Sequence, residues 1–223
     1  MRVVILAAGS SERMARMLGG LAGKPWIHVG GETLIHRTYR ICGELGFVAG
    51  AIVLATHEET GVKIPVHLSD LGNPANGAHT TLGVCETTVE RMRQVLAQPS
   101  CAEGCTFLLG DVFYSRAALR TILTDGTDPC WYGRKGRHPI WERGDDGEVY
   151  AVRVGLEGID LVRREADRLR AGKLRWLHDA IAARYPKMIS RAWHEIADYT
   201  DDFDVPEDLD RSPEMARMAA EET

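Results

Sequence analysis

The chain opens on an apolar run that ends at a glycine. Residues 3–8, Val-Val-Ile-Leu-Ala-Ala, include no polar position, and Gly9 follows them. A short β-branched run without alternation predicts a strand that is buried on both faces, as in the middle of a parallel sheet. We expect this strand to be the central one.

In the first half of the chain, apolar residues also recur at the spacing of a helix. Apolar positions predict a helix over 33–45, which Thr33 can cap and Gly46 can end. A second pattern predicts a helix over 80–96, and Ser115 can cap a third helix. Apolar runs predict further strands at 51–55, 64–68 and 106–109. This order of strands and helices predicts a parallel sheet with helices on both sides.

The pattern changes beyond Asp111. Residues 129–135 and 149–154 predict strands of a different piece, an antiparallel hairpin or flap. Helices over 159–169 and 174–185 follow them.

In the helix expected over 174–185, apolar residues such as Trp176 and Leu177 have the spacing of a face that packs on the core, so we expect them to be buried. A strand over 193–196 and a helix over 206–220, with an acidic tail expected to fray, complete the pattern. Together the elements predict an α/β fold: a single Rossmann-like three-layer domain with a mostly parallel central sheet and a small antiparallel flap.

Composition and charge narrow the class of protein. The 223 residues carry a formal net charge of -5 and scatter Lys and Arg along the sequence, which argues against nucleic acid as the principal partner. No apolar stretch approaches the ~20 residues that span a bilayer, so we expect no membrane partner. The first strand lacks the charged region and cleavage site of a secretion signal, so we expect a cytoplasmic protein.

The cysteines indicate a reduced protein. Their number, five, is odd and argues against a disulfide framework. Cys101 and Cys105 are the only close pair, and no second Cys/His pair follows at zinc-finger spacing. We expect Cys42 and Cys85, on apolar faces of predicted helices, to lie in the core.

Small polar residues follow the first strand. Gly9, Ser10 and Ser11 can present backbone N–H groups and hydroxyls to an anion. Arg13 and Lys24 bring two positive charges to the same place. This pattern is typical of a triphosphate cradle, and the alternative is an ordinary strand and loop of another α/β protein.

Three segments together resemble a known family signature: Leu6-Ala7-Ala8-Gly9-x-x-x-Arg13-Met14, then Lys24-Pro25, then Val29-Gly30-Gly31-x-x-Leu34-Ile35. They are similar to the signature of the MobA-like and sugar-phosphate nucleotidyltransferases. The resemblance implies an α/β fold that binds a nucleoside triphosphate and transfers its nucleoside monophosphate. It implies catalytic roles for Arg13 and Lys24, and nucleotide binding by Leu6, Ala7, Ala8, Gly9, Ser10 and Ser11. The chain departs from the family at Ser11 or Glu12, where glycine is common, and at Trp26, where leucine is.

Two other phosphate-binding motifs are excluded. Residues 19–24 loosely resemble a Walker loop, but Pro25 occupies the Ser/Thr position that would bind magnesium and lacks the N–H that such a loop donates. A dinucleotide fingerprint needs two more glycines after Gly9 and an acidic residue about twenty residues on, and neither is present.

Carboxylates for Mg²⁺ are expected at strand ends that face the loop. Asp111 follows an apolar strand and Gly110, which permits a close approach. Near the C-terminus, residues 202–209 resemble the family's "DIDTPEDL" segment, which implies Asp204 as a second ligand and Asp202 as its partner. The alternatives are a turn residue at Asp111 and a solvated acidic turn over residues 201–204.

Other acidic and polar residues have two interpretations. Glu207 and Asp208 follow Pro206, a favoured first residue of a helix. We therefore expect them to stabilise a helix N-terminus rather than to bind a metal. The loop over 73–81 corresponds to the base-recognition loop of related enzymes, so the resemblance implies nucleotide-binding roles for Asn73, Asn76 and Gly77. An ordinary Asn/Gly turn before a helix is the alternative.

Positive charge gathers beside aromatic residues in the second half. Arg134, Lys135 and Arg137 can hold the phosphate or carboxylate of an acceptor, or belong to a basic loop exposed to solvent.

The resulting hypothesis is a Mg²⁺-dependent nucleotidyltransferase that moves a nucleoside monophosphate to a small phosphorylated acceptor and releases pyrophosphate. Alternatives are a molybdopterin-type cofactor nucleotidyltransferase, a nucleotide-sugar-dependent glycosyltransferase of related fold and a non-enzymatic nucleotide-binding regulator. We expect one domain over residues 1–223, with a nucleotide-binding half over 1–125 and an acceptor-binding half with the C-terminal metal segment over 126–223. The predicted flap strands and exposed aromatic residues leave room for a homodimer.

Overall fold

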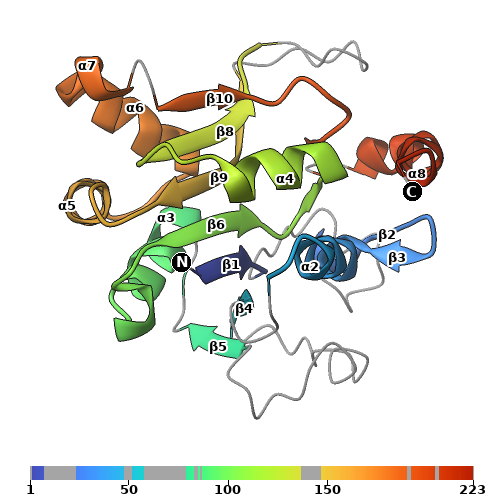
Figure 1. The fold of residues 1–223 in the computed structure, drawn as a ribbon, viewed down its shortest axis with the longest axis horizontal. Coiled ribbons are helices and arrows are strands. Elements are labelled where there is room, and N and C mark those ends of the chain that lie inside the picture. The colour runs from blue at the N-terminus through green and yellow to red at the C-terminus, as the bar shows by residue number, and fades with distance from the viewer. Residues whose placement is uncertain are drawn as a thin grey trace.

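A seven-stranded sheet forms the centre of the protein. The computed structural model describes residues 2–7, 24–47, 52–57, 79–82, 85, 87–136, 147–189, 192–203 and 206–222. The strands lie in the order β10-β8-β9-β6-β1-β4-β5 (Figure 1). Their bounds are β1 (Arg2–Leu6), β4 (Ile52–His57), β5 (His79–Leu82), β6 (Cys105–Leu109), β8 (Cys130–Arg134), β9 (Glu148–Val154) and β10 (Trp193–Glu195).

Most neighbouring strands in this sheet are parallel. β1 pairs in parallel with both β4 and β6, β4 with β5, and β10 with β8. β9 runs antiparallel to both of its neighbours, β6 and β8. Two small antiparallel sheets accompany the large one: β2 (His28–Val29) with β3 (Glu32–Thr33), and β7 (Val112–Phe113) with β11 (Asp201–Asp202). The predicted mostly parallel α/β architecture is confirmed.

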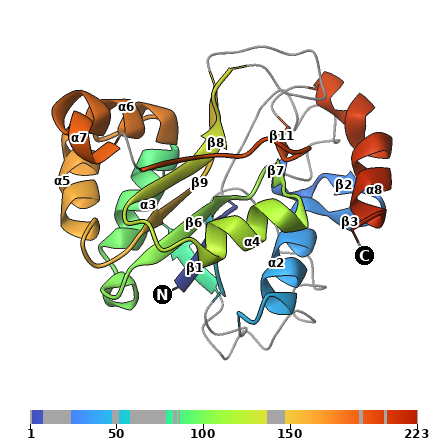
Figure 2. The same ribbon diagram turned by 45° about the horizontal axis from the view of Figure 1, so that its top comes forward.

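Helices cover both faces of the sheet and make the three predicted layers (Figure 2). One face carries α3 (Thr88–Leu96), α5 (Ile159–Leu169), α6 (Leu174–Arg184) and α7 (Pro186–Ile189). The other carries α2 (Leu34–Glu44) and α4 (Arg116–Thr124), with α8 (Ser212–Ala220) beyond them. Three 3₁₀ helices complete the described elements: η1 (Lys24–Trp26), η6 (Pro99–Cys101) and η7 (Pro206–Arg211).

Alternate side chains of β1 serve the two cores. Val4 and Leu6 pack in the cluster under α3, α5 and α6, whereas Val3 and Ile5 pack in the cluster under α2 and α4. Because successive side chains of a strand point to opposite faces, an unbroken apolar run is required here. The prediction of a buried strand inside the sheet is confirmed, although the middle strand of the seven is β6, the neighbour of β1.

The helix predicted over 33–45 is confirmed with its cap. The Thr33 hydroxyl accepts a hydrogen bond from the His36 amide at 3.2 Å, and Gly46 follows the helix with a φ of +95°. Ser115 caps α4 as predicted, because its hydroxyl accepts a bond from the Ala118 amide at 2.8 Å.

The helix predicted over 80–96 begins later than expected. Residues 79–82 form β5, which pairs in parallel with β4 at the sheet edge, and α3 starts only at Thr88. Thr87 and Glu90 form a capping box there, with the Thr87 amide donating to the Glu90 carboxylate at 2.7 Å. The strand predicted over 64–68 lies outside the described residues.

The hairpin predicted from 129–135 and 149–154 is confirmed as β8 and β9, and both strands belong to the central sheet rather than to a separate piece. Trp176 does not lie in the core, because its side chain on α6 is 57% exposed. Leu177, the next residue, is buried beneath the same helix.

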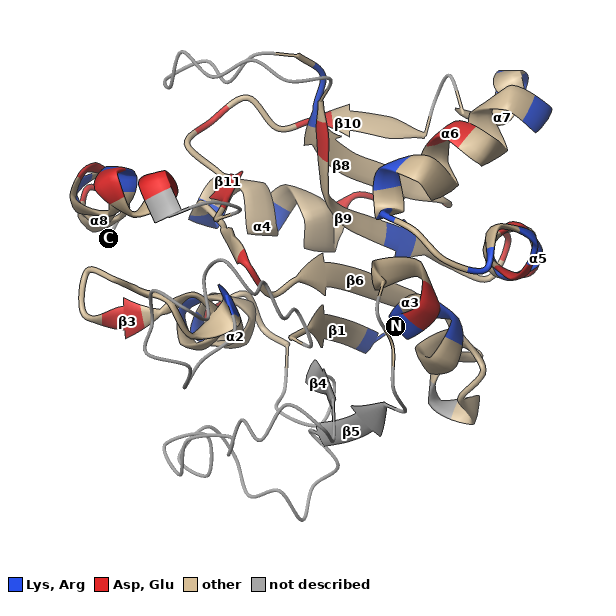
Figure 3. Ribbon diagram, turned by 180° about the vertical axis from the view of Figure 1, so that it is seen from behind, with Lys and Arg blue, Asp and Glu red and all other residues tan. Residues whose placement is uncertain are grey.

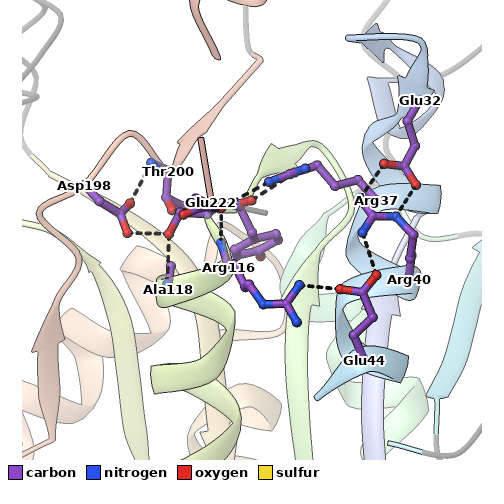
Figure 4. Close-up of polar contacts among 11 residues, drawn as sticks. Glu32, Arg37, Arg40, Glu44, Arg116, Ala118, Asp198, Thr200 and Glu222 are labelled. Carbon is purple, nitrogen blue, oxygen red and sulfur yellow. Dashed lines mark hydrogen bonds and ion pairs between the residues drawn. The ribbon is translucent and has the colours of Figure 1, made fainter. Parts of the chain in front are cut away.

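The acidic tail after α8 is docked rather than frayed. The Glu222 carboxylate accepts a hydrogen bond from the backbone amide of Arg116 at 3.0 Å and lies 3.4 Å from the Arg37 guanidinium (Figure 4). It thereby joins the end of the described chain to α2 and to the N-terminus of α4.

Cys101 and Cys105 form a disulfide with a Cα–Cα distance of 5.7 Å, which corrects the expectation of unpaired cysteines. The disulfide joins the last residue of η6 to the first residue of β6. Cys42 and Cys85 are buried as predicted, although Cys85 precedes α3 rather than lying within it. Within the described ranges, no helix has the length and hydropathy needed to cross a membrane.

Candidate functional site

A tight turn at the carboxyl end of β6 presents Asp111. The Gly110 amide donates to the Leu6 carbonyl of β1 at 3.1 Å. A Cβ on Gly110 would lie 2.9 Å from the same oxygen, so a larger residue would push the two strand ends apart. The glycine therefore lets Asp111 sit beside the end of β1, as the sequence predicted.

Lys24 lies against this carboxylate. Its ammonium nitrogen is 3.6 Å from Asp111 Oδ2, and the two side chains are 12% and 23% exposed. Lys24 begins η1, whose next two residues, Pro25 and Trp26, are buried. Trp26, one of the two departures from the family pattern, packs in the core cluster under α2 and so anchors Lys24 near the strand ends.

The C-terminal acidic segment adjoins the same turn. β11 pairs with β7, which matches Asp202 with Val112, and the Phe203 amide donates to the Asp111 carbonyl at 3.1 Å. Phe203 is fully buried. The two segments in which metal ligands were predicted are therefore joined by backbone hydrogen bonds.

Several predicted site residues lie outside the described residues: Ala8, Gly9, Ser10, Ser11, Arg13, Asn73, Asn76, Gly77, Arg137 and Asp204. Leu6 and Ala7 are described, and they lie at the end of β1 beside Gly110. The roles proposed for all of these residues stay predictions.

Arg134 lies in a network of charged groups. Its guanidinium is 3.2 Å from the Glu148 carboxylate and 3.3 Å from the Asp201 carboxylate. The Tyr150 hydroxyl also donates to Asp201, at 3.4 Å. Arg211 forms a second ion pair with Asp201, and it holds Asp208 at 2.7 Å.

This network changes the interpretation of Asp208. The residue is buried and paired with Arg211 across one turn of η7, so it stabilises the segment through an ion pair rather than only through a helix N-terminus. Sequence reasoning missed Arg211 and considered Asp201 only as part of a solvated acidic turn, whereas Asp201 is buried and paired with two arginines. Their partners come from β8, β9 and η7, and no local pattern indicates that those elements meet.

Lys135 points elsewhere. Its ammonium lies 4.9 Å from the ring centre of Trp193 on β10, and its backbone amide donates to Glu195 at 2.8 Å. Arg134 and Lys135, predicted as one acceptor-binding group, therefore have different surroundings. Among the described residues, Lys and Arg are distributed over several helices and strands (Figure 3).

Carboxylates suitable for a divalent cation gather near the turn. Glu148, Asp201 and Asp202 have oxygens within 4.8 Å of one another. Arg134 and Arg211 already balance the charge of Asp201. Asp111 is not one of these three residues, and its carboxylate pairs with Lys24. Asp111 and Asp202 are both partly accessible and offer the hard oxygen donors that a divalent cation prefers, so the donor chemistry fits such an ion.

Arg91 is a further charged group that sequence reasoning missed. It is buried on α3, and its guanidinium donates to the Cys85 carbonyl at 3.5 Å. Burial lowers the pKa of Arg91, while the charge of Asp111 opposes this shift. The positive charge of Arg91 therefore interacts with the charge of Asp111, in addition to that of Lys24.

Residues 3–143 match the family model of the MobA-like NTP transferase domain. No curated protein matches the chain.

Solved structures share the fold over nearly the whole length. The chain is similar to the inositol-1-phosphate CTP transferase from T. maritima, with 12% identity, a TM-score of 0.65 and coverage of 99% of this chain and 96% of that one. It is also similar to the CTP:phosphocholine cytidylyltransferase from Streptococcus pneumoniae, with 15% identity, a TM-score of 0.64 and coverage of 96% and 98%. Because the family match spans more than half of the sequence, the chain belongs to the MobA-like NTP transferase domain family and is a nucleotidyltransferase.

Proposed function

We propose that this nucleotidyltransferase transfers a nucleoside monophosphate from a nucleoside triphosphate to a small phosphorylated acceptor, in a Mg²⁺-dependent reaction that releases pyrophosphate. The observation that carries the proposal is the contact of Lys24 with Asp111 where β1 and β6 end. In open α/β sheets, ligands bind at the carboxyl ends of parallel strands.

The proposed chemistry depends on positioning and charge. An ionised phosphate oxygen of the acceptor attacks the α-phosphorus of the triphosphate, a new P–O bond forms, and the bond to the pyrophosphate oxygen breaks. The attacking oxygen is already deprotonated at neutral pH, so the chain needs no general base. Lys24 and Arg13 are proposed to neutralise the charge that develops on the transferred group and on the leaving pyrophosphate.

Asp111 and Asp204, with Asp202 as a further carboxylate, are proposed to hold Mg²⁺. When bound, this ion neutralises phosphate charge. The bond from Phe203 to Asp111 supports the assignment, because it ties the segment before Asp204 to the Asp111 turn.

The proposed acceptor is a sugar phosphate or a phospho-alcohol. Two structural neighbours are named for inositol 1-phosphate and phosphocholine, both small phosphorylated alcohols. Arg134, Lys135 and Arg137 remain candidates for binding the acceptor. The carboxylates around Arg134 favour a positioning role for that residue.

A thermal-shift screen with ATP, CTP, GTP and UTP, each with and without Mg²⁺, tests the donor site. A ligand at one hundred times its dissociation constant adds about 2.7 kcal/mol to the free energy of unfolding. For a chain of this size we expect one triphosphate to raise the melting temperature by roughly 5–10 °C, only with Mg²⁺ present.

The Asp111→Ala variant is the control for this screen and should lose the Mg²⁺-dependent part of the shift. A shift with a nucleotide-sugar but with no triphosphate would contradict the proposal and favour glycosyl transfer. Pyrophosphate release measured with a panel of phosphorylated acceptors then identifies the second substrate.

A further inference from the structure

The buried hydroxyl of Tyr114 lies at the base of the Asp111 turn. Tyr114 directly follows β7 and is fully buried. Its oxygen accepts a hydrogen bond from the Leu109 amide at 2.9 Å and donates to the Tyr150 carbonyl of β9 at 2.6 Å. One side-chain atom thus bonds to the backbone of two strands.

The Tyr114 hydroxyl makes the hydrogen bonds that the next residue pair of β6 and β9 would otherwise make. β6 and β9 are paired as far as Leu108 and Ala151, and the following pair would be Leu109 with Tyr150. The Tyr114 oxygen bonds to both of these residues. The strands can therefore separate after Leu108 without leaving a buried amide unpaired.

The same contact closes a short loop. Leu109 and Tyr114 are its two ends, and Asp111 lies between them. The loop is fixed at other points by Gly110 bonding to Leu6 and by Phe203 bonding to Asp111.

A buried arginine supports the far end of the loop. Arg37 Nε donates to the Tyr114 carbonyl at 3.3 Å, and its guanidinium lies 4.6 Å from the ring centre of Phe113. Burial raises the pKa of Tyr114 well above its ordinary value, and the charges of Asp111 and Asp202 raise it further. The hydroxyl therefore stays protonated and remains a donor at neutral pH.

We propose that Tyr114 is a positioning residue for the nucleotidyl transfer: its hydroxyl ends the β6–β9 pairing and fixes Asp111 in the orientation that faces Lys24 and a divalent cation. The inference rests on the proposed function, because it assigns a role toward the ion that Asp111 is proposed to hold. Outer groups that orient a metal ligand typically contribute 10–100-fold to metal affinity.

The test measures Mn²⁺ binding to the protein alone by the decrease of the free-ion electron paramagnetic resonance signal, without triphosphate or acceptor, because a triphosphate itself binds Mn²⁺. Tyr114→Phe removes one oxygen atom and should weaken Mn²⁺ binding by about tenfold or more. Tyr132→Phe is the matched control. Tyr132 is also fully buried in the core cluster under α2 and α4, but its hydroxyl lies near Asp125 and Cys130. We expect Tyr132→Phe to bind Mn²⁺ within twofold of the wild type.

The Asp111→Ala variant distinguishes a failure of the proposed metal site from a failure of the proposed role of Tyr114. If Asp111→Ala binds Mn²⁺ as the wild type does, the proposed metal site is wrong and the role of Tyr114 falls with it. If Asp111→Ala loses binding while Tyr114→Phe keeps it, or if both tyrosine variants weaken it equally, only the role of Tyr114 is overturned.

Hydrogen exchange of the wild-type protein provides a second test that does not depend on the folding of a variant. The Leu109 amide should exchange slowly, like the amides within β6, because the Tyr114 oxygen accepts its proton. Exchange as fast as that of an exposed amide would overturn the proposal.

Discussion

The charged residues at the Asp111 turn act through their immediate neighbours. Lys24 approaches Asp111 because Pro25 and Trp26 are buried and fix the 3₁₀ turn from which it extends. Asp111 reaches the same point because Gly110 allows two strand ends to touch. Small and apolar residues thus determine where the charges lie.

Replacement of Lys24 by alanine should lower turnover by about 10²-fold and leave the fold intact. The substitution removes one preorganised positive charge, which is proposed to stabilise the nucleotidyl group during its transfer. Pyrophosphate release measures the loss, and circular dichroism checks the fold. Lys187→Ala, on the exposed surface of α7, is the control and should retain full activity. Wild-type turnover in Lys24→Ala would exclude the catalytic role.

Sequence alone indicated Lys24 and Asp111 because each lies in a short motif whose spacing has chemical meaning. It did not indicate the network of Arg134, Asp201 and Arg211, because these residues meet only through tertiary contacts between β8, β11 and η7. Trp176 was misplaced for a related reason. Its spacing fits an inward face, but the side chain lies on the exposed surface of α6.

At the scale of elements, local caps predicted helices well where the apolar pattern was unambiguous. The helix capped by Thr33 is an example. Over 80–96 the apolar positions fit a helix throughout, yet pairing with β4 makes residues 79–82 a strand. Thr87 and Glu90, three residues apart, carried a local signal for the true start of α3, and the longer apolar pattern obscured it.

The Thr87 cap should contribute measurably to stability. Thr87→Ala removes the hydroxyl that accepts a hydrogen bond from the Glu90 amide, so we expect a loss of about 1 kcal/mol in the free energy of unfolding. Urea denaturation monitored by fluorescence measures it. Thr124→Ala is the control, because the Thr124 hydroxyl is exposed and bonds only within α4. An equal loss in both variants would argue against a capping contribution.

Across the whole molecule, long-range contacts join the last described residues to α2 and α4. Glu222 connects the segment after α8 to Arg37 on α2 and to the start of α4, and Arg116 continues the connection to Glu44 (Figure 4). The division into a nucleotide-binding half and an acceptor-binding half stays a prediction. In the sheet, the strands of the two parts lie side by side rather than intermixed, and they meet where β9 pairs with β6.

Loss of the Glu222 carboxylate should destabilise this arrangement. Glu222→Ala leaves Arg37 and the Arg116 amide without their common acceptor, so we expect the free energy of unfolding to fall by about 1–2 kcal/mol and the melting temperature by roughly 2–8 °C. Glu221→Ala is the control, because that exposed side chain pairs only with Arg217 on its own helix. Equal melting temperatures for the two variants would contradict the anchoring role.

The backbone bond between Phe203 and Asp111 has a consequence for biosynthesis. A chain leaving the ribosome releases β1 and β6 early, and their ends can meet at Gly110 as soon as both have emerged. The Asp111 carbonyl gains its partner only after Phe203 has followed, so this part of the site is added only once β8, β9, α5 and α6 have emerged. A nascent chain can therefore build much of its core before it can complete the site.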